Sequence, residues 1–151
     1  MFYTVGEMAK RLGIPASTLR YYDQEGLLPF VERANNGTRL FKDSDYEWLQ
    51  IIECLKKTGM PLKDIKVFIH MAMDGDSTID PRLELIRRQR ESVLKQMDEL
   101  QQTLDTLDYK VWYYETAKNA GSTSALKDIA TEDLPEKFQE VRKRLRHESL
   151  R

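Results

Sequence analysis

The sequence predicts a mainly α-helical fold in which a small unit of short helices and one β-hairpin precedes a single long helix. Three observations predict it. Glycine and proline at residues 13–15 separate two short helical patterns. An Asn-Gly pair lies between two runs of β-forming residues, which is a strong signal for a hairpin. From about residue 80 to residue 118, apolar residues recur three and four positions apart, as in a coiled coil.

The composition fits such a fold. The chain has 151 residues, of which 40% are apolar and 32% are charged. Its net charge of −1 gives no broad cationic field, but residues 1–42 hold six basic and four acidic side chains. This local excess is in the direction expected for nucleic-acid binding. Because the sequence has no apolar run of membrane-spanning length and no signal-peptide pattern, we expect a cytoplasmic protein without a membrane partner.

The first two helices read as a helix-turn-helix. Apolar residues share one face of residues 5–12, and Thr4 and Glu7 are spaced as a capping box at the start. Gly13 ends this helix, Pro15 begins the next, and Gly26 ends that one. A second helix presented in this way suits the major groove of DNA. Its polar groups able to reach phosphates or base edges are Ser17, Thr18, Arg20, Tyr21 and Tyr22.

A hairpin follows the second helix, with its turn at residues 34–37. Asn36 and Gly37 both accept a positive φ, which the tightest hairpin turns require. A small ribbon after a helix-turn-helix is a wing. Arg33 on one arm and Arg39 on the other are placed to track the DNA backbone or to enter the minor groove.

Two further helices and a polar break complete this part of the chain. The third helix begins at Asp43 or Ser44 and ends at Gly59, and Pro61 opens the fourth. The break at residues 74–78 marks a domain boundary. We therefore expect a DNA-binding domain at 1–74, a linker at 75–80, a coiled-coil dimerisation helix at 81–118 and a short effector region at 119–151. In the last segment, a helix is expected from Leu134-Pro135 through Arg146.

The long helix carries a seam of apolar residues that one copy of the chain cannot bury. The ten seam positions are Leu83, Ile86, Arg90, Val93, Met97, Leu100, Leu104, Leu107, Val111 and Tyr114. Nine of the ten are apolar, and Arg90 is expected to fix the register at some cost in stability. A second chain should supply the partner helix, so the sequence predicts a homodimer.

Taken together, these stretches resemble the mercury-resistance-regulator (MerR) family. The resemblance rests on residues 3–9, 17–28, 36–39 and 58–62, which occur in the family's order and spacing. It implies a dimeric winged helix-turn-helix transcription regulator paired through an antiparallel coiled coil. Such regulators bind promoter DNA with a long spacer and, on a signal, distort it so that RNA polymerase engages both promoter elements. The contacts must repay the energy of deforming the duplex.

The family motif also implies which residues touch double-stranded promoter DNA. Ser17, Thr18, Arg20 and Tyr22 would do so from the recognition helix, with Tyr21 packing against the wing instead. The wing would contribute Arg33, Thr38 and Arg39. The backbone at residues 60–62 would hold a phosphate at a helix N-terminus.

The sequence leaves the signal open but excludes some classes of sensor. Metal-sensing members need cysteines after the long helix, and no cysteine follows Cys54. His70 and His147 are too few and too far apart to replace them, so we expect no metal and no cofactor. Only about 30 residues follow the coiled coil, so we do not expect the large drug-binding domain of the multidrug branch.

Cys54 has two interpretations. It is either a small buried hydrophobe within the third helix, or a reactive thiol that senses aldehydes or other electrophiles, as in a single-cysteine subgroup of the family. In the second case Lys56 and Lys57 would favour the thiolate. A different possibility is a small aromatic or apolar effector bound near the end of the long helix. The aromatic residues that would line its site, or else merely pack together, are Trp112, Tyr113, Tyr114 and Phe138.

An enzyme is not expected, because no catalytic triad, phosphate-binding glycine loop or metal-ligand set occurs in the sequence. The remaining alternative is a coiled-coil adaptor whose helix-turn-helix binds protein. Arg20, Arg33 and Arg39 argue against it, since a protein-binding unit does not need cations on both the helix and the wing.

Overall fold

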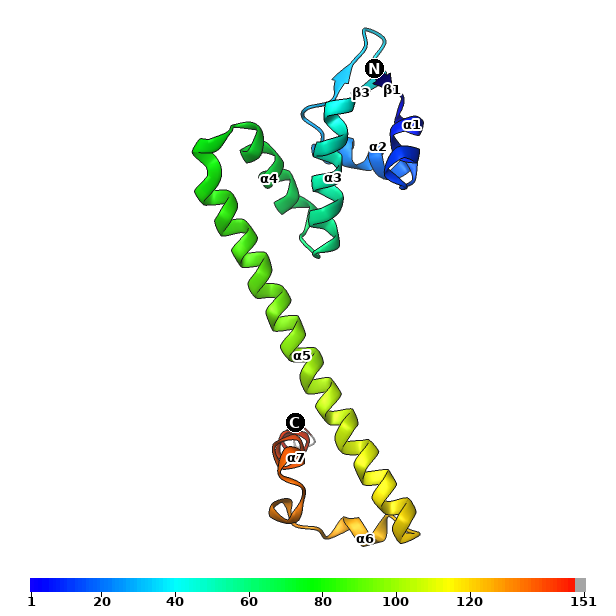
Figure 1. Ribbon diagram of the computed structural model, residues 1–151, viewed down its shortest axis with the longest axis vertical. Helices are drawn as coiled ribbons and strands as arrows, with labels where there is room; N and C mark the ends of the chain where they lie inside the picture. The colour runs from blue at the N-terminus through cyan, green and yellow to red at the C-terminus, as the bar shows by residue number, and fades with distance from the viewer. Residues whose placement is uncertain (149–151) are drawn as a thin grey trace. The chain divides into compact units, whose positions relative to one another are not determined.

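The computed structural model describes residues 1–148 and divides into two compact units, Met1–Val93 and Leu94–Arg151, which are described separately below. Helices predominate, as predicted (Figure 1). The elements in chain order are β1 (Phe2–Tyr3), α1 (Val5–Leu12), α2 (Ala16–Gln24), β2 (Glu32–Arg33), β3 (Arg39–Lys42), α3 (Asp43–Lys57), α4 (Leu62–Met73), the 3-10 helix η1 (Asp76–Thr78), α5 (Ile79–Ala120), α6 (Ser124–Lys127), the 3-10 helix η2 (Thr131–Asp133) and α7 (Glu136–Glu148).

The predicted helix-turn-helix is confirmed in α1 and α2. The Thr4 hydroxyl accepts a hydrogen bond from the Glu7 backbone N–H at 3.2 Å, and the Glu7 carboxylate accepts one from the Thr4 N–H at 2.8 Å. This is the predicted capping box. Gly13 ends α1 with φ of 71°, in the left-handed region that glycine tolerates. Pro15 lies directly before α2, where its missing N–H leaves no helical hydrogen bond unmade.

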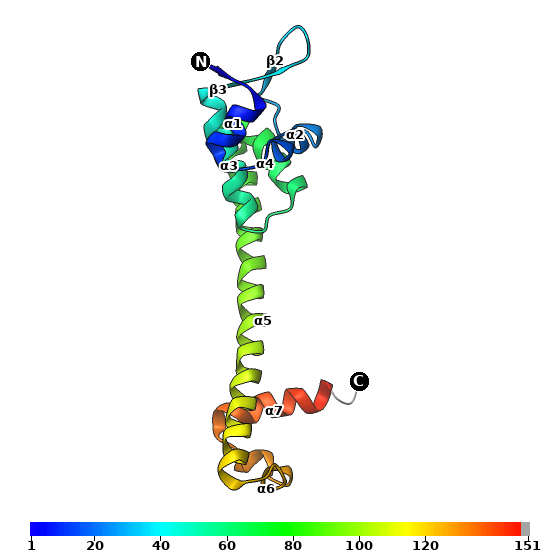
Figure 2. The ribbon, with the colours of Figure 1, turned by 90° about the vertical axis from the view of Figure 1, so that its right-hand side faces the viewer.

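The predicted hairpin is confirmed, with its turn at the predicted residues 34–37. Strands β2 and β3 pair antiparallel, and the loop between them projects from the first unit (Figure 2). Within this turn Gly37 has a positive φ and Asn36 does not. The Gly37 N–H donates to the Ala34 carbonyl at 2.8 Å, so the turn spans residues 34–37 and needs only one left-handed residue.

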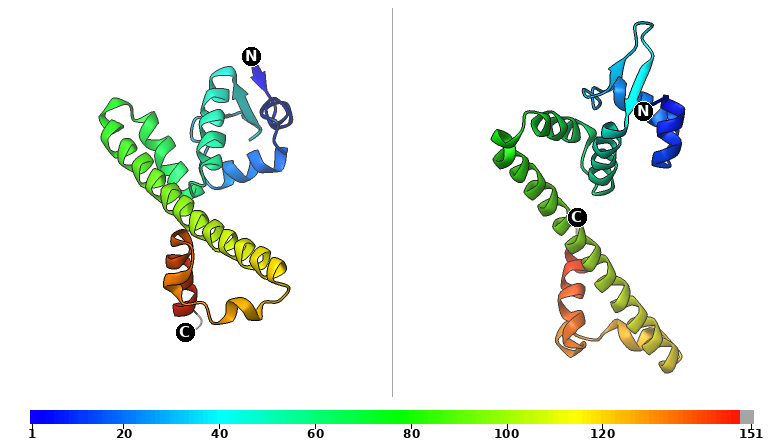
Figure 3. Two further views of the ribbon diagram at one scale, coloured as in Figure 1. Left: turned by 60° about the horizontal axis from the view of Figure 1, so that its bottom comes forward. Right: turned by 45° about the horizontal axis from the view of Figure 1, so that its top comes forward.

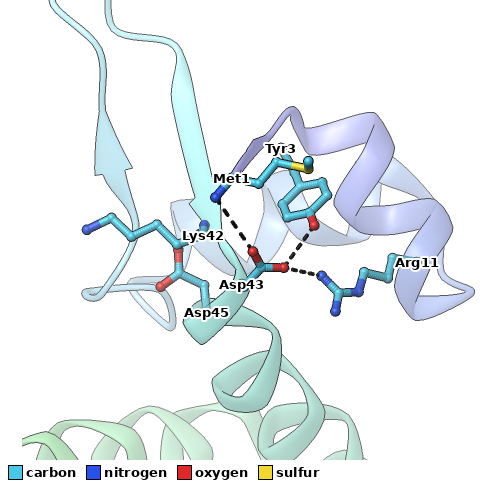
Figure 4. Close-up of polar contacts among 6 residues, drawn as sticks. All are labelled: Met1, Tyr3, Arg11, Lys42, Asp43 and Asp45. Carbon is cyan, nitrogen blue, oxygen red and sulfur yellow. Dashed lines mark hydrogen bonds and ion pairs between the residues drawn. The ribbon is translucent and has the colours of Figure 1, made fainter.

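A further strand, which the sequence analysis did not predict, extends this hairpin into a sheet of order β1-β3-β2. Strand β1 pairs antiparallel with β3. Asp43, at the start of α3, fastens it (Figure 4). The Asp43 Oδ1 accepts hydrogen bonds from the Tyr3 hydroxyl at 2.8 Å and the Arg11 Nη1 at 2.9 Å, and its Oδ2 lies 3.6 Å from the Met1 amine. Arg11, and after it Tyr3, hold the pKa of the Asp43 carboxyl below its usual range.

The core of the first unit lies among α1 to α4 and receives one residue from α5. The buried side chains are Met8, Ala9, Leu19, Tyr22, Leu27, Leu28, Phe41, Leu49, Ile52, Leu55, Met60, Ile65, Ile69 and Leu85. Leu85 comes from the first turns of α5, which therefore pack within this unit. The Gln89 amide also donates to the Thr58 carbonyl at 2.8 Å. The segment 75–80, predicted as a linker, contains Gly75, η1 and the first two residues of α5.

The second unit holds the rest of α5 and the chain that returns beside it as α7 (Figure 3). Phe138 packs against Trp112 and Tyr109, with ring centroids 5.5 and 5.7 Å away. Arg144 donates to the Gln102 carbonyl at 2.9 Å and to the Thr106 hydroxyl at 2.8 Å. The predicted last helix is thus confirmed as α7, and it packs on one stripe of α5.

The predicted seam lies on a different stripe of α5 and is open in the single chain. Eight of the ten seam residues are exposed hydrophobic side chains, from Ile86 at 38% to Leu100 at 69% exposure. Val93 is half-buried and Arg90 is exposed. An apolar stripe of this extent needs a partner. No helix within residues 1–148 combines the length and the apolar character that crossing a membrane requires.

Candidate nucleic-acid interface

The N-terminal half of α2 presents three polar side chains that have no partner among residues 1–148. Ser17 and Arg20 are exposed, and Thr18 is half-buried. Within residues 1–148 none of the three side chains makes a hydrogen bond or an ion pair. They are therefore available to an external acceptor or donor. The polar face predicted for the second helix is present at these three positions.

Tyr22 occupies a different place from the predicted DNA contact. Its side chain is only 1% exposed and lies in the core. The Tyr22 hydroxyl donates to the Glu53 Oε1 at 2.6 Å and accepts a hydrogen bond from the Lys56 Nζ at 2.9 Å. Burial, and after it the Glu53 hydrogen bond, raises the pKa of the Tyr22 phenol, so the hydroxyl stays a donor near neutral pH. The ring joins α2 to α3 instead of reaching outward.

Tyr21, its neighbour, is the exposed tyrosine of the pair. It is 47% exposed, whereas the sequence analysis expected it to pack against the wing. Successive residues in a helix point about 100° apart, so one of two adjacent tyrosines must turn away from the core. The pattern of apolar residues did not decide which one.

The two wing arginines converge on Asp23 of α2. Oδ2 of Asp23 accepts from Arg33 Nη2 at 2.6 Å and from Arg39 through Nε at 2.6 Å and Nη2 at 2.5 Å. Arg33 remains 52% exposed, while Arg39 is 21% exposed. Thr38 is exposed beside the turn. Asp23 was not predicted as a site residue from the sequence. A carboxylate in the last turn of a helix is nevertheless unfavourable next to the helix dipole, and such a residue needs a compensating cation.

The turn before α4 leaves helical N–H groups open. Pro61 precedes the helix and provides no side-chain cap, and the Asp64 and Ile65 N–H groups donate to the Pro61 carbonyl. The N–H groups of Leu62 and Lys63, one position earlier, have no helical acceptor. An anion can be held at such an end, although Asp64 in the first turn opposes it.

Cys54 is exposed on α3, so its interpretation as a small buried hydrophobe is wrong. It lies between Glu53 and Lys56, which both hold the Tyr22 hydroxyl. Lys56 is therefore engaged with the recognition helix and does not point freely toward the thiol. The core of α3 is formed instead by Leu49, Ile52 and Leu55, on its other face.

The histidines and carboxylates form no metal centre in the described chain. No three His, Cys, Asp or Glu side chains of residues 1–148 lie close enough together to hold an ion. The His70 Nε2 lies 3.4 Å from the Gly26 carbonyl, which ties α4 to the end of the helix-turn-helix. The side chain of His147 lies outside the part of the structure that is described.

The second unit contains a cavity of about 330 Å³ between α5 and α7. Trp112 and Phe138 line it, as the effector interpretation expected, while Tyr113 and Tyr114 do not. Its other lining residues are Asp105, Asp108, Val111, Glu115 and Lys137. The aromatic residues therefore pack against each other and also border an open space.

Two models of one protein family match this chain. The family model described as "MerR HTH family regulatory protein" matches residues 3–71, and the model "MerR, DNA binding" matches residues 46–109. An HTH-type transcriptional regulator of Haemophilus influenzae is 48% identical over 126 residues, which is 83% of this chain and 93% of the relative.

Solved structures agree. HiNmlR, described as a MerR family regulator lacking the sensor domain and bound to promoter DNA, is 49% identical with a TM-score of 0.61, over 83% of this chain and 99% of that chain. A MerR family transcriptional regulator from Bacillus thuringiensis is 41% identical with a TM-score of 0.59, over 74% and 97% of the two chains.

Proposed function

The chain belongs to the MerR family of helix-turn-helix regulatory proteins, and from this we propose how it reads a promoter. It is a DNA-binding transcriptional regulator that acts as a homodimer. The relatives are transcriptional regulators, and we infer that this chain likewise acts by binding DNA rather than by catalysing a reaction. Its site of action would be the cytoplasm, where a bacterial promoter lies. An adaptor role for the helix-turn-helix is disfavoured by the promoter DNA bound to the HiNmlR structure.

The direct contacts would come from two places on the first unit. Ser17, Thr18 and Arg20 would face the major groove from α2, and Arg33 and Thr38 would reach the backbone from the wing. The observation that supports this best is that the three α2 side chains are unpaired within residues 1–148. Tyr22 and Arg39 would not contact DNA directly, but would position the residues that do. Tyr22 would hold α2 against α3, and Arg39 would hold the wing against α2.

The long helix would bring two such surfaces onto one duplex. The open seam of α5 is the surface for a second copy, paired antiparallel so that the two DNA-binding units lie at opposite ends. We propose that residues 1–74 bind DNA, 75–80 form a linker, 81–118 pair with the second copy and 119–151 form a C-terminal effector region. Bending and untwisting of the spacer would then allow RNA polymerase to engage the promoter, without a direct contact from this chain.

Binding of the full chain to the DNA upstream of its own gene tests this function. Affinity should exceed that for a shuffled duplex and should fall steeply as salt rises, because phosphate contacts release counterions. Affinity that is equal for both duplexes would contradict sequence-specific regulation. Affinity that ignores salt would contradict the phosphate contacts.

We infer that the signal is an electrophile that reacts at Cys54. The thiolate sulfur would add to the carbonyl carbon of an aldehyde, and the carbonyl oxygen would take up a proton, giving a hemithioacetal. The support is the place of Cys54, which is exposed and flanked by the two residues that hold Tyr22 of the recognition helix. An adduct there would press on that contact. Promoter activity in Cys54→Ser should no longer rise with aldehyde, and a normal rise would end this assignment.

A small aromatic or apolar effector in the cavity beside Trp112 and Phe138 is the second candidate signal. Such a ligand should quench tryptophan fluorescence and should still act in the Cys54→Ser variant. Phe138→Ala would open the cavity wall and abolish the quenching if the ligand binds there. The response of Cys54→Ser and the fluorescence of Phe138→Ala therefore distinguish a ligand bound in the cavity from a reaction at the Cys54 thiol.

A further inference from the structure

Asp23 is an acidic residue at a position where the dipole of its own helix disfavours negative charge. It lies in the last turn of α2, close to the partial negative charge of the helix C-terminus. Its side chain is only 14% exposed, so water screens it poorly. A carboxylate in such a place needs compensation from cations. The compensation comes from another element, the wing.

The wing in turn carries a pair of like charges that needs an acid. Arg33 and Arg39 are direct cross-strand partners in the register of β2 and β3. Like charges facing each other across a ladder repel. A single oxygen, Asp23 Oδ2, receives both guanidinium groups, and Arg39 approaches it through two nitrogens. Arg33 Nη1 also donates to the Gly37 carbonyl at 3.2 Å, which extends the contact to the tip of the wing.

We propose that Asp23 is a positioning residue that sets DNA specificity by clamping the wing to the recognition helix. The clamp, defined as Asp23 with Arg33 and Arg39, fixes the angle at which the wing and α2 meet one duplex. The Asp23 carboxylate also neutralises part of the charge of Arg33 and Arg39, which lowers the attraction of these two side chains for phosphates of DNA of any sequence. This proposal rests on the proposed DNA contacts of α2 and the wing.

Removing the charge of Asp23 should therefore change the two kinds of binding in opposite directions. In Asp23→Asn, Arg33 and Arg39 repel each other and the wing is no longer held at one angle. Binding to the promoter should weaken, because contacts from the helix and the wing no longer align. Binding to unrelated DNA should strengthen, since two guanidinium groups become free for phosphates.

The experiment compares fluorescence anisotropy of the full chain on its own upstream duplex and on a shuffled duplex of equal composition, over a salt series. For Asp23→Asn we expect the ratio of promoter affinity to shuffled-duplex affinity to fall about tenfold or more. On the shuffled duplex, the slope of log affinity against log salt concentration should steepen by about one. Glu25→Gln is the matched control, with the same charge change two residues away. Glu25 is exposed and makes no ion pair within residues 1–148, so both affinities should rise together and the ratio should stay constant.

A second variant keeps the test decisive if Asp23→Asn unfolds at a much lower temperature. Arg39→Lys keeps the charge but loses the two-nitrogen fork, so the affinity ratio should fall while the salt slope stays unchanged. If the ratio of promoter affinity to shuffled-duplex affinity stays within twofold of the wild type in both variants, the proposed role of Asp23 is wrong. The proposed DNA contacts of α2 and the wing would not be affected by that result. A wild-type chain without preference for its upstream duplex would overturn the proposed contacts, and the clamp with them.

Discussion

The hydroxyl of Tyr22 in α2 donates a hydrogen bond of 2.6 Å to the Glu53 carboxylate in α3. Lys56 of the same helix donates to that hydroxyl at 2.9 Å. The recognition helix is thus joined by one phenol to the helix that carries Cys54. A change at these α3 residues would therefore act directly on α2, the helix proposed to contact DNA.

The strength of this junction can be measured with Tyr22→Phe, which keeps the ring in the core and removes the hydroxyl. Because a hydrogen bond to a charged group is lost, the free energy of unfolding should fall by about 1.5 to 3 kcal/mol in urea denaturation. Tyr22→Ala should cost more, about 3 to 5 kcal/mol, since it also leaves a cavity. A Phe variant as stable as the wild type would show that the junction contributes nothing.

Arg20 should behave differently from Tyr22, because it is exposed and has no ion-pair or hydrogen-bond partner within residues 1–148. Arg20→Ala should weaken promoter binding by about 1 to 3 kcal/mol, or roughly five- to 150-fold, with little change in stability. Affinity titration and thermal unfolding check the two parts of this prediction. Lys118→Ala, in the second unit, is the control and should leave affinity within twofold. Equal effects of the two variants would remove Arg20 from the interface.

The seam of α5 predicts how the chain associates. Leu104, 50% exposed in the single chain, should be buried in the dimer, so Leu104→Asp would place a charge in an apolar interface. Sedimentation at micromolar concentration should then show a monomer. Lys95→Gln makes the same change in net charge on an exposed position outside the seam and should remain a dimer. A dimeric Leu104→Asp variant would contradict the seam.

The cluster around Asp43 predicts a pH dependence of stability. Since the pKa of the folded state lies below the ordinary value of 3.8, the unfolded chain binds the proton more readily. The contribution of Asp43 is therefore full above pH 3.8 and is lost as the pH falls through the lowered pKa. The stability difference between wild type and Asp43→Asn should be constant near neutral pH and shrink in acid. In an Arg11→Met background the same comparison should vary less with pH, and an equal variation would contradict this cause.

Local signals in the sequence were sufficient for most of the fold. The capping box of Thr4 and Glu7 and the terminator Gly13 act within one turn of a helix, so their residues suffice to predict the helix ends. The seam of α5 repeats often enough to be read without a structure. Strand β1 could not be predicted, because two residues carry no period and their pairing with β3 spans some forty positions.

Less of the candidate interface could be predicted from the sequence, because its geometry depends on contacts between elements. Both Tyr21 and Tyr22 are aromatic and polar, and only the packing of α2 on α3 shows which one is buried. Asp23 meets Arg33 and Arg39 across the fold, so no spacing in the sequence indicates the clamp. The exposure of Cys54 likewise follows from which face of α3 the core selects.

The stoichiometry of the complex tests the central claim, that two paired copies read one promoter. Native mass spectrometry of the full chain, saturated with the duplex from upstream of its own gene, should show two chains on each duplex and no complex with one. A complex that saturates at a single chain per duplex would contradict the account.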